Sequence, residues 1–138
     1  MAYRVRKVNY CKFSVTSRAG TAEKILGAIK DAGVNMQAFS GFPAGGGKAQ
    51  VDLVSDNMTG IRRVAKENGW RVSATKKGFL VQGDDETGAI YKVFRKLADN
   101  KINVTAADAV SAGKGRYGMI MWVKPKVYNK AARVLNAK

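Results

Sequence analysis

An internal repeat at a fixed offset limits the folds open to this chain more than any other feature of its sequence. Residues 19–35 align without a gap with residues 87–103, at an offset of 68 positions. The glycine and apolar positions of one stretch coincide with those of the other. A repeat of this kind predicts two copies of one supersecondary unit. We therefore expect two domains, residues 1–76 and residues 77–138.

Both halves show the same order of strand and helix signals. Each begins with an apolar strand pattern, at 10–16 or 78–82, followed by a turn and a helix. The helices are predicted from apolar residues at the i, i+3, i+4, i+7 spacing of one buried face. These residues are Ala22, Ile25, Leu26 and Ile29 in the first half, and Ile90, Val93, Phe94 and Leu97 in the second.

The remainder of each half predicts a hairpin and a second helix. A strand opens at Val34 or Ile102, and the glycine-rich segments 45–48 and 113–116 lead into a third strand as hairpin turns. A phosphate-binding loop would need a longer spacing and a following helix. The second helices are predicted at 57–68 and 126–137, and a fourth strand of the first half at 70–75.

Strand–helix–strand–strand–helix–strand is the ferredoxin-like order of elements. We therefore predict an α+β fold made of two ferredoxin-like βαββαβ repeats, with antiparallel sheets packed together. The second repeat lacks its own last strand, because the chain ends after the second helix. The extended segment 2–8 either completes that sheet or remains a solvated basic tail.

Composition excludes several kinds of function. The chain has no histidine and a single cysteine, which argues against a zinc site and removes the commonest general base. We expect no enzyme activity, no metal and no cofactor. No apolar run is long enough to span a membrane, and the start of the chain lacks a signal-peptide pattern, so we expect a cytoplasmic protein. The net charge of +15 fits a phosphate-polymer partner or a generally basic proteome.

The repeated motifs resemble those of the ACT domain. That family has a turn ending in glycine, an amphipathic helix, and then a Gly-(Ile/Val)-Asn segment opening a second strand. The second half matches with DETG (85–88) and KINV (101–104), and the first with SRAG (17–20) and GVNM (33–36). Thr87 stands where the family has proline.

The resemblance implies a regulatory protein that binds a small molecule, most often an amino acid, between two ACT domains. It also implies which positions contact the ligand. By position these are Asp85, Glu86, Thr87, Gly88 and Asn103 in the second half, and Ser17, Arg18, Ala19, Gly20 and Asn35 in the first.

The chemistry of these residues suits an amino acid. The start of a helix offers free N–H groups to a carboxylate, and glycine allows close approach to the backbone. Asp85 could accept a ligand ammonium group, or it could cap the helix, as could Thr87. An asparagine side chain could form hydrogen bonds with both the carboxylate and the ammonium group of the ligand. It could instead form hydrogen bonds with backbone groups next to its helix. Arg18 favours an anion, so we expect the two sites to differ.

We therefore predict a non-catalytic regulatory protein with two ACT-like repeats that binds an amino acid and forms a homodimer. The alternative is a basic ferredoxin-like protein that binds nucleic acid through a positively charged surface. An RNA-recognition sheet presents several aromatic residues on one central strand. Alternation instead predicts that Tyr117 and Trp122 point to opposite faces. A third possibility is an interaction module without a ligand.

Overall fold

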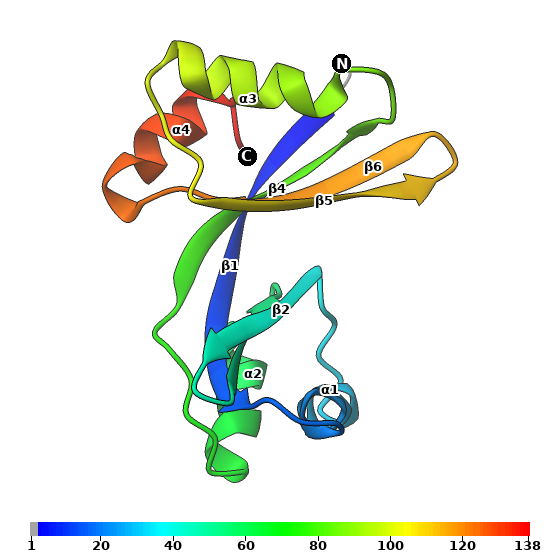
Figure 1. Cartoon of the computed structure of the whole chain (residues 1–138), viewed down its shortest axis with the longest axis vertical. Coiled ribbons are helices and arrows are strands. Elements are labelled where there is room, and N and C mark those ends of the chain that lie inside the picture. The colour runs from blue at the N-terminus through cyan, green and yellow to red at the C-terminus, as the bar shows by residue number, and fades with distance from the viewer. Residues whose placement is uncertain (1–2) are drawn as a thin grey trace. The chain divides into compact units, whose positions relative to one another are not determined.

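The structure, a computed structural model, describes residues 3–138 and contains two compact units (Figure 1). The first unit is residues 9–76, and the second unit is residues 77–138 together with residues 3–8. The elements in chain order are β1 (Tyr3–Thr16), α1 (Thr21–Asp31), β2 (Ala38–Gly45), β3 (Lys48–Val54), α2 (Met58–Glu67), β4 (Lys76–Asp84), α3 (Ala89–Asp99), β5 (Ala106–Gly113), β6 (Arg116–Trp122), a 3₁₀ turn (Pro125–Val127) and α4 (Tyr128–Val134).

The first unit is built on three strands in the order β2–β3–β1, paired antiparallel. Side chains alternate across a strand, so Cys11 and Phe13 of β1 share a face with their partners on β3. That face packs against the apolar sides of α1 and α2, with Ile29 and Ile61 in the core. The predicted periodicity of the first helix is therefore right for Ile25 and Ile29, whereas Ala22 is exposed and Leu26 is half-buried outside this core.

In the second unit the strand order is β1–β4–β6–β5, and α3 and α4 lie on one side of β4, β5 and β6 (Figure 1). Phe79 and Met119 from the strands meet Val93 and Leu97 of α3 in the core. Tyr128 of α4 stacks on Phe79, with ring centroids 4.5 Å apart and planes inclined by 7°. The predicted α+β, ferredoxin-like βαββαβ fold is confirmed.

The predicted edge segment 2–8 starts at a residue outside the described part of the chain. Its residues 3–8 belong to β1, which is hydrogen-bonded to β4 in the second unit. Val5 is buried in the core of that unit, and its carbonyl oxygen accepts a 3.1 Å hydrogen bond from the amide of Lys138.

Two sequence predictions about strands are wrong. Residues 70–75 form no strand, and only Val72 makes an isolated bridge, to Phe13. Ser73 explains this outcome, because its hydroxyl oxygen accepts the hydrogen bond from the amide of Lys12 that a backbone carbonyl would accept in a ladder. The carbonyl of Ser73 in turn accepts from the guanidinium of Arg62, at 2.9 Å.

The second strand of each half begins four residues later than predicted, at Ala38 and Ala106. The amides of Val34 and Ile102 still donate back to carbonyls inside the preceding helix, at 3.1 and 2.9 Å. These bonds hold the chain against the helix end, so strand pairing starts only beyond them. The following glycine-rich segments are hairpin turns, as predicted: Gly45–Gly47 all have positive φ.

Candidate functional site

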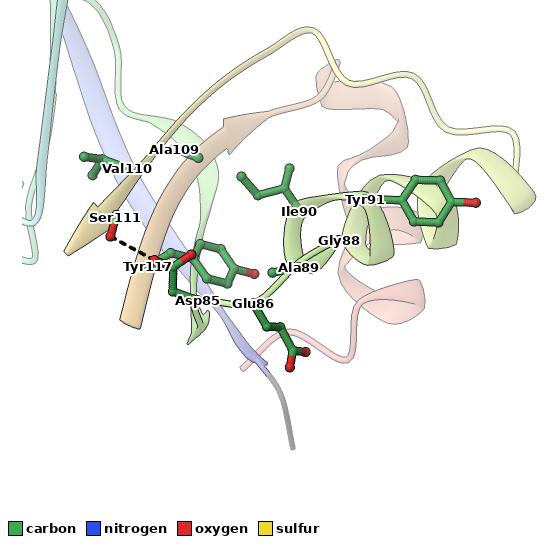
Figure 2. Close-up of a pocket in the computed structure, with 10 residues that line it drawn as sticks. All are labelled: Asp85, Glu86, Gly88, Ala89, Ile90, Tyr91, Ala109, Val110, Ser111 and Tyr117. Atoms are coloured by element: carbon green, nitrogen blue, oxygen red, sulfur yellow. Dashed lines mark hydrogen bonds between the residues drawn. The ribbon is translucent and has the colours of Figure 1, made fainter. Parts of the chain in front are cut away.

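The second unit contains a cavity of about 250 Å³ between the start of α3 and the end of the β5–β6 hairpin (Figure 2). It is lined by Asp85, Glu86, Gly88, Ala89, Ile90, Tyr91, Ala109, Val110, Ser111 and Tyr117. Three of these, Asp85, Glu86 and Gly88, were predicted as ligand contacts. Thr87, between them, does not line the cavity, and its side chain is exposed.

The α3 N-terminus faces the cavity with unused hydrogen-bond donors. Gly88 precedes the helix in the left-handed region, at φ 80°, and no side chain caps the helix. The amides of Ala89 and Lys92 have acceptors, but those of Ile90 and Tyr91 find none within residues 3–138. Free N–H groups and the helix dipole favour a negative charge here.

The two acidic residues differ in what holds them. Oδ2 of Asp85 accepts a 2.9 Å hydrogen bond from the hydroxyl of Ser111, and its amide is bonded to the carbonyl of Gly115. Oε1 of Glu86 accepts from Nζ of Lys92 at 2.8 Å, and this hydrogen bond raises the pKa of Lys92. Glu86 therefore has a cation already, whereas Asp85 has no cation within ion-pair distance among residues 3–138.

Tyr117 of β6 forms the floor of the cavity. Its side chain is only 4% exposed, and its hydroxyl has no hydrogen-bond partner in the described part of the chain. Figure 2 shows the hydroxyl end turned toward the start of α3, beside Ala89. Burial, followed by the nearby Tyr3 and Glu86, raises the pKa of this phenol, although Arg116 acts in the opposite direction. A buried hydroxyl without a partner is costly.

The first unit has a cavity of about 590 Å³ next to the start of α1. Its other walls are β1 and residues 69–71, and only Lys48 comes from the β2–β3 hairpin that corresponds to β5–β6. Arg18, Ala19 and Gly20, which were predicted as ligand contacts, line the cavity, while Ser17 does not. The full lining is Phe13, Ser14, Val15, Thr16, Arg18, Ala19, Gly20, Thr21, Glu23, Lys24, Ile25, Lys48, Gly69, Trp70 and Arg71. Part of each predicted residue set therefore lies at a cavity, and the two cavities have different side chains around them.

Neither predicted asparagine lines these cavities. Asn35 and Asn103 are exposed and follow Val34 and Ile102 in the segments that precede β2 and β5. The carbonyl of Asn35 accepts a 2.7 Å hydrogen bond from the hydroxyl of Ser55. The prediction that these residues open a strand is wrong, because the chain there is still bonded to the helix end.

Sequence reasoning missed several lining residues. Ile90 was assigned to the buried helix face, but its side chain is 39% exposed at the cavity. Tyr117 was considered only as a base-stacking residue, yet both it and Trp122 are buried and present no ring for stacking. Lys48 and Arg71 reach the first cavity from distant segments. The one signal in the sequence was Tyr117 itself, a tyrosine at the start of the third strand of the second repeat.

Other kinds of site find no support within residues 3–138. No group of three or more potential metal ligands occurs there. None of the helices in this range has the length and apolar character needed to cross a membrane.

No protein-family model and no curated protein matches the sequence. Solved structures match it in fold, at low sequence identity. Protein BT0572 from Bacteroides thetaiotaomicron is similar with a TM-score of 0.79 at 14% identity, over 99% of this chain and 90% of the other. The ligand-free regulatory subunit of aspartate kinase from Thermus thermophilus gives a TM-score of 0.69 at 12% identity, over 99% and 95% of the two chains.

The regulatory subunit of aspartate kinase from Thermus flavus is also similar, with a TM-score of 0.63 at 12% identity over 99% and 95% of the chains. Each likeness extends over almost the whole of both proteins. The fold of this chain is therefore ACT-like, as the repeated motifs predicted.

Proposed function

We propose that this protein is a non-catalytic regulatory protein with two ACT-like repeats, and that its second unit binds a small amino acid. The fold likeness to regulatory subunits of aspartate kinase supports the regulatory part of this proposal. The cavity of about 250 Å³ supports the ligand size, because pockets for drug-sized ligands usually measure about 300–1,000 Å³. A cytoplasmic location and a homodimer remain predictions.

The polar groups of the cavity suit the two charges of an amino acid. The ligand carboxylate would accept hydrogen bonds from the free amides of Ile90 and Tyr91 at the start of α3. Its ammonium group would donate to Asp85, which has no cation of its own. Val110 of β5 and the side chain of Ile90 offer an apolar contact for a small side chain.

The single observation that carries the proposal is the pairing of two complementary polar groups at the start of α3. The amides of Ile90 and Tyr91 have no acceptor, and the carboxylate of Asp85 has no cation, among residues 3–138. Both groups lie at the cavity. An amino acid would bring a carboxylate for the amides and an ammonium group for Asp85 in one molecule.

Regulation would follow from population shift. A ligand that binds one packing of the repeats or subunits more tightly favours that packing by its difference in affinity. The protein would respond to amino-acid concentration in this way without performing chemistry on the ligand.

The test is the thermal midpoint of the whole chain, measured with each of the twenty amino acids. A ligand at a hundred times its dissociation constant adds about 2.7 kcal/mol of stability. Asp85→Asn should abolish the shift caused by the active amino acid, while the matched control Asp99→Asn, an exposed acid on α3, should keep it. A flat response to all twenty amino acids would refute the proposal. A flat response with a salt-sensitive shift from single-stranded RNA would favour the nucleic-acid alternative.

A further inference from the structure

The cavity of the first unit is surrounded by cations. Arg18, Lys24, Lys48 and Arg71 all line it, against a single acid, Glu23. None of the four lies within ion-pair distance of a carboxylate in the described range 3–138. Four positive side chains held around one cavity repel each other, so the free protein gains from an anion placed among them.

The cavity at the start of α3 in the second unit has the opposite charge. Its lining contains Asp85 and Glu86 and no lysine or arginine. At the repeat offset, Ser17 stands where the second unit has Asp85, and Arg18 stands where it has Glu86. The first cavity therefore offers no free carboxylate in its turn to receive an ammonium group. A second copy of the amino-acid site would need one.

The walls and size of the first cavity suit an organic molecule larger than an inorganic ion. Trp70 is half-buried in the wall, and its ring meets the ring of Phe13 edge-on with centroids 6.4 Å apart. The volume of about 590 Å³ is within the usual range for small-molecule pockets. The rigid aromatic wall can contact an apolar part of a ligand, and the cationic rim can contact an anionic group of the same ligand.

We propose that the first unit binds a phosphorylated small molecule in this cavity. A phosphate group at neutral pH carries about −1.5 to −2 charges and three acceptor oxygens, which matches several cations better than a single carboxylate does. The guanidinium groups of Arg18 and Arg71 can each give two parallel hydrogen bonds to phosphate, and Lys24 and Lys48 add point charges. The organic part of the ligand lies against Trp70.

This site uses no residue of the amino-acid cavity. The two proposals therefore stand or fall separately. The protein would then read two signals, an amino acid in the second unit and a phosphorylated compound in the first. Because the cations are exposed, their field extends into solvent and binding should weaken as salt rises.

The test is isothermal titration of the whole chain with inorganic phosphate, pyrophosphate and AMP at constant ionic strength. The double variant Arg18→Gln, Arg71→Gln removes two cations from the cavity. The control Arg63→Gln, Lys66→Gln removes the same charge from exposed positions of α2 that do not line the cavity. We expect the cavity variant to raise the dissociation constant of AMP at least tenfold, which corresponds to about 1.4 kcal/mol. The control should change it less than about twofold.

Three results would overturn the proposal. The first is no binding of any phosphate compound at about 10 mM, a concentration at which weak small-molecule sites of about 1 mM are filled. The second is an equal loss of affinity in both double variants, which would mean a general effect of net charge. The third is tight binding of single-stranded RNA that AMP does not displace, which would indicate a nucleic-acid surface. A native thermal transition in each variant excludes loss of folding as the cause.

Discussion

Two buried tyrosines of the second unit give a direct test of the unpaired hydroxyl. Tyr117 and Tyr128 are 4% and 6% exposed. The hydroxyl of Tyr117 has no partner in the described range, whereas that of Tyr128 donates a 2.9 Å hydrogen bond to the carbonyl of Gly78. Tyr117→Phe removes a hydroxyl without a hydrogen-bond partner, and Tyr128→Phe removes a hydroxyl that has one.

The expected changes in stability have opposite signs. Burying a hydroxyl without a partner costs about 1–3 kcal/mol in proteins, so Tyr117→Phe should stabilise the free protein by about 1 kcal/mol. Tyr128→Phe keeps the ring stacked on Phe79 but leaves the buried carbonyl of Gly78 without this donor, which should cost about 2 kcal/mol. The two variants should therefore differ by about 3 kcal/mol in their free energy of unfolding.

Urea unfolding followed by far-UV circular dichroism measures this difference. With a slope of about 2 kcal/mol per molar urea, the midpoints of the two variants should lie about 1.5 M apart, with wild type between them. Equal destabilisation by both substitutions would refute the reasoning, since it would mean that the Tyr117 hydroxyl already has a partner in the free protein.

Three further outcomes follow from particular residues. Burial raises the pKa of the Cys11 thiol from 9.0 to about 11, so the neutral thiol favours the folded state, and this contribution to stability should be lost as pH rises from 9 through 11. At pH 8 a thiol reagent should modify the native protein much more slowly than the urea-unfolded protein. Equal rates would contradict the burial of Cys11. Oδ1 of Asn57 accepts a 2.8 Å hydrogen bond from the amide of Gly60, so Asn57→Ala should cost about 1 kcal/mol in urea unfolding, and no loss would mean that this cap is unimportant. Lys101 follows α3 at φ 60°, at the position where the first unit has Gly33 at φ 73°. Lys101→Gly should therefore raise the free energy of unfolding by about 1 kcal/mol, measured by urea unfolding. Gly33→Lys should lower it by a similar amount.

Prediction from sequence succeeded where the controlling interactions are local. The helix starts, helix ends and hairpin turns follow from glycine positions and from apolar spacing that neighbouring residues alone define. The turns before α1 and α3 belong to this class, which explains why Asp85, Glu86, Gly88 and Arg18 were found at cavities. The starts of the second strands were nevertheless predicted too early, because the amides of Val34 and Ile102 remain hydrogen-bonded to the preceding helices.

The sequence by itself determined the helix-start loops and the order of elements apart from the strand expected at 70–75, since these depend on residues close together in the chain. Only the tertiary structure decided what faces those loops. Tyr117 reaches the second cavity because β6 pairs with β4, with Tyr117 opposite Gly83. Lys48 and Arg71 gather around the first cavity from segments more than twenty residues apart. Long-range pairing sets which side chains meet and which hydroxyl lacks a partner, and no local pattern encodes it.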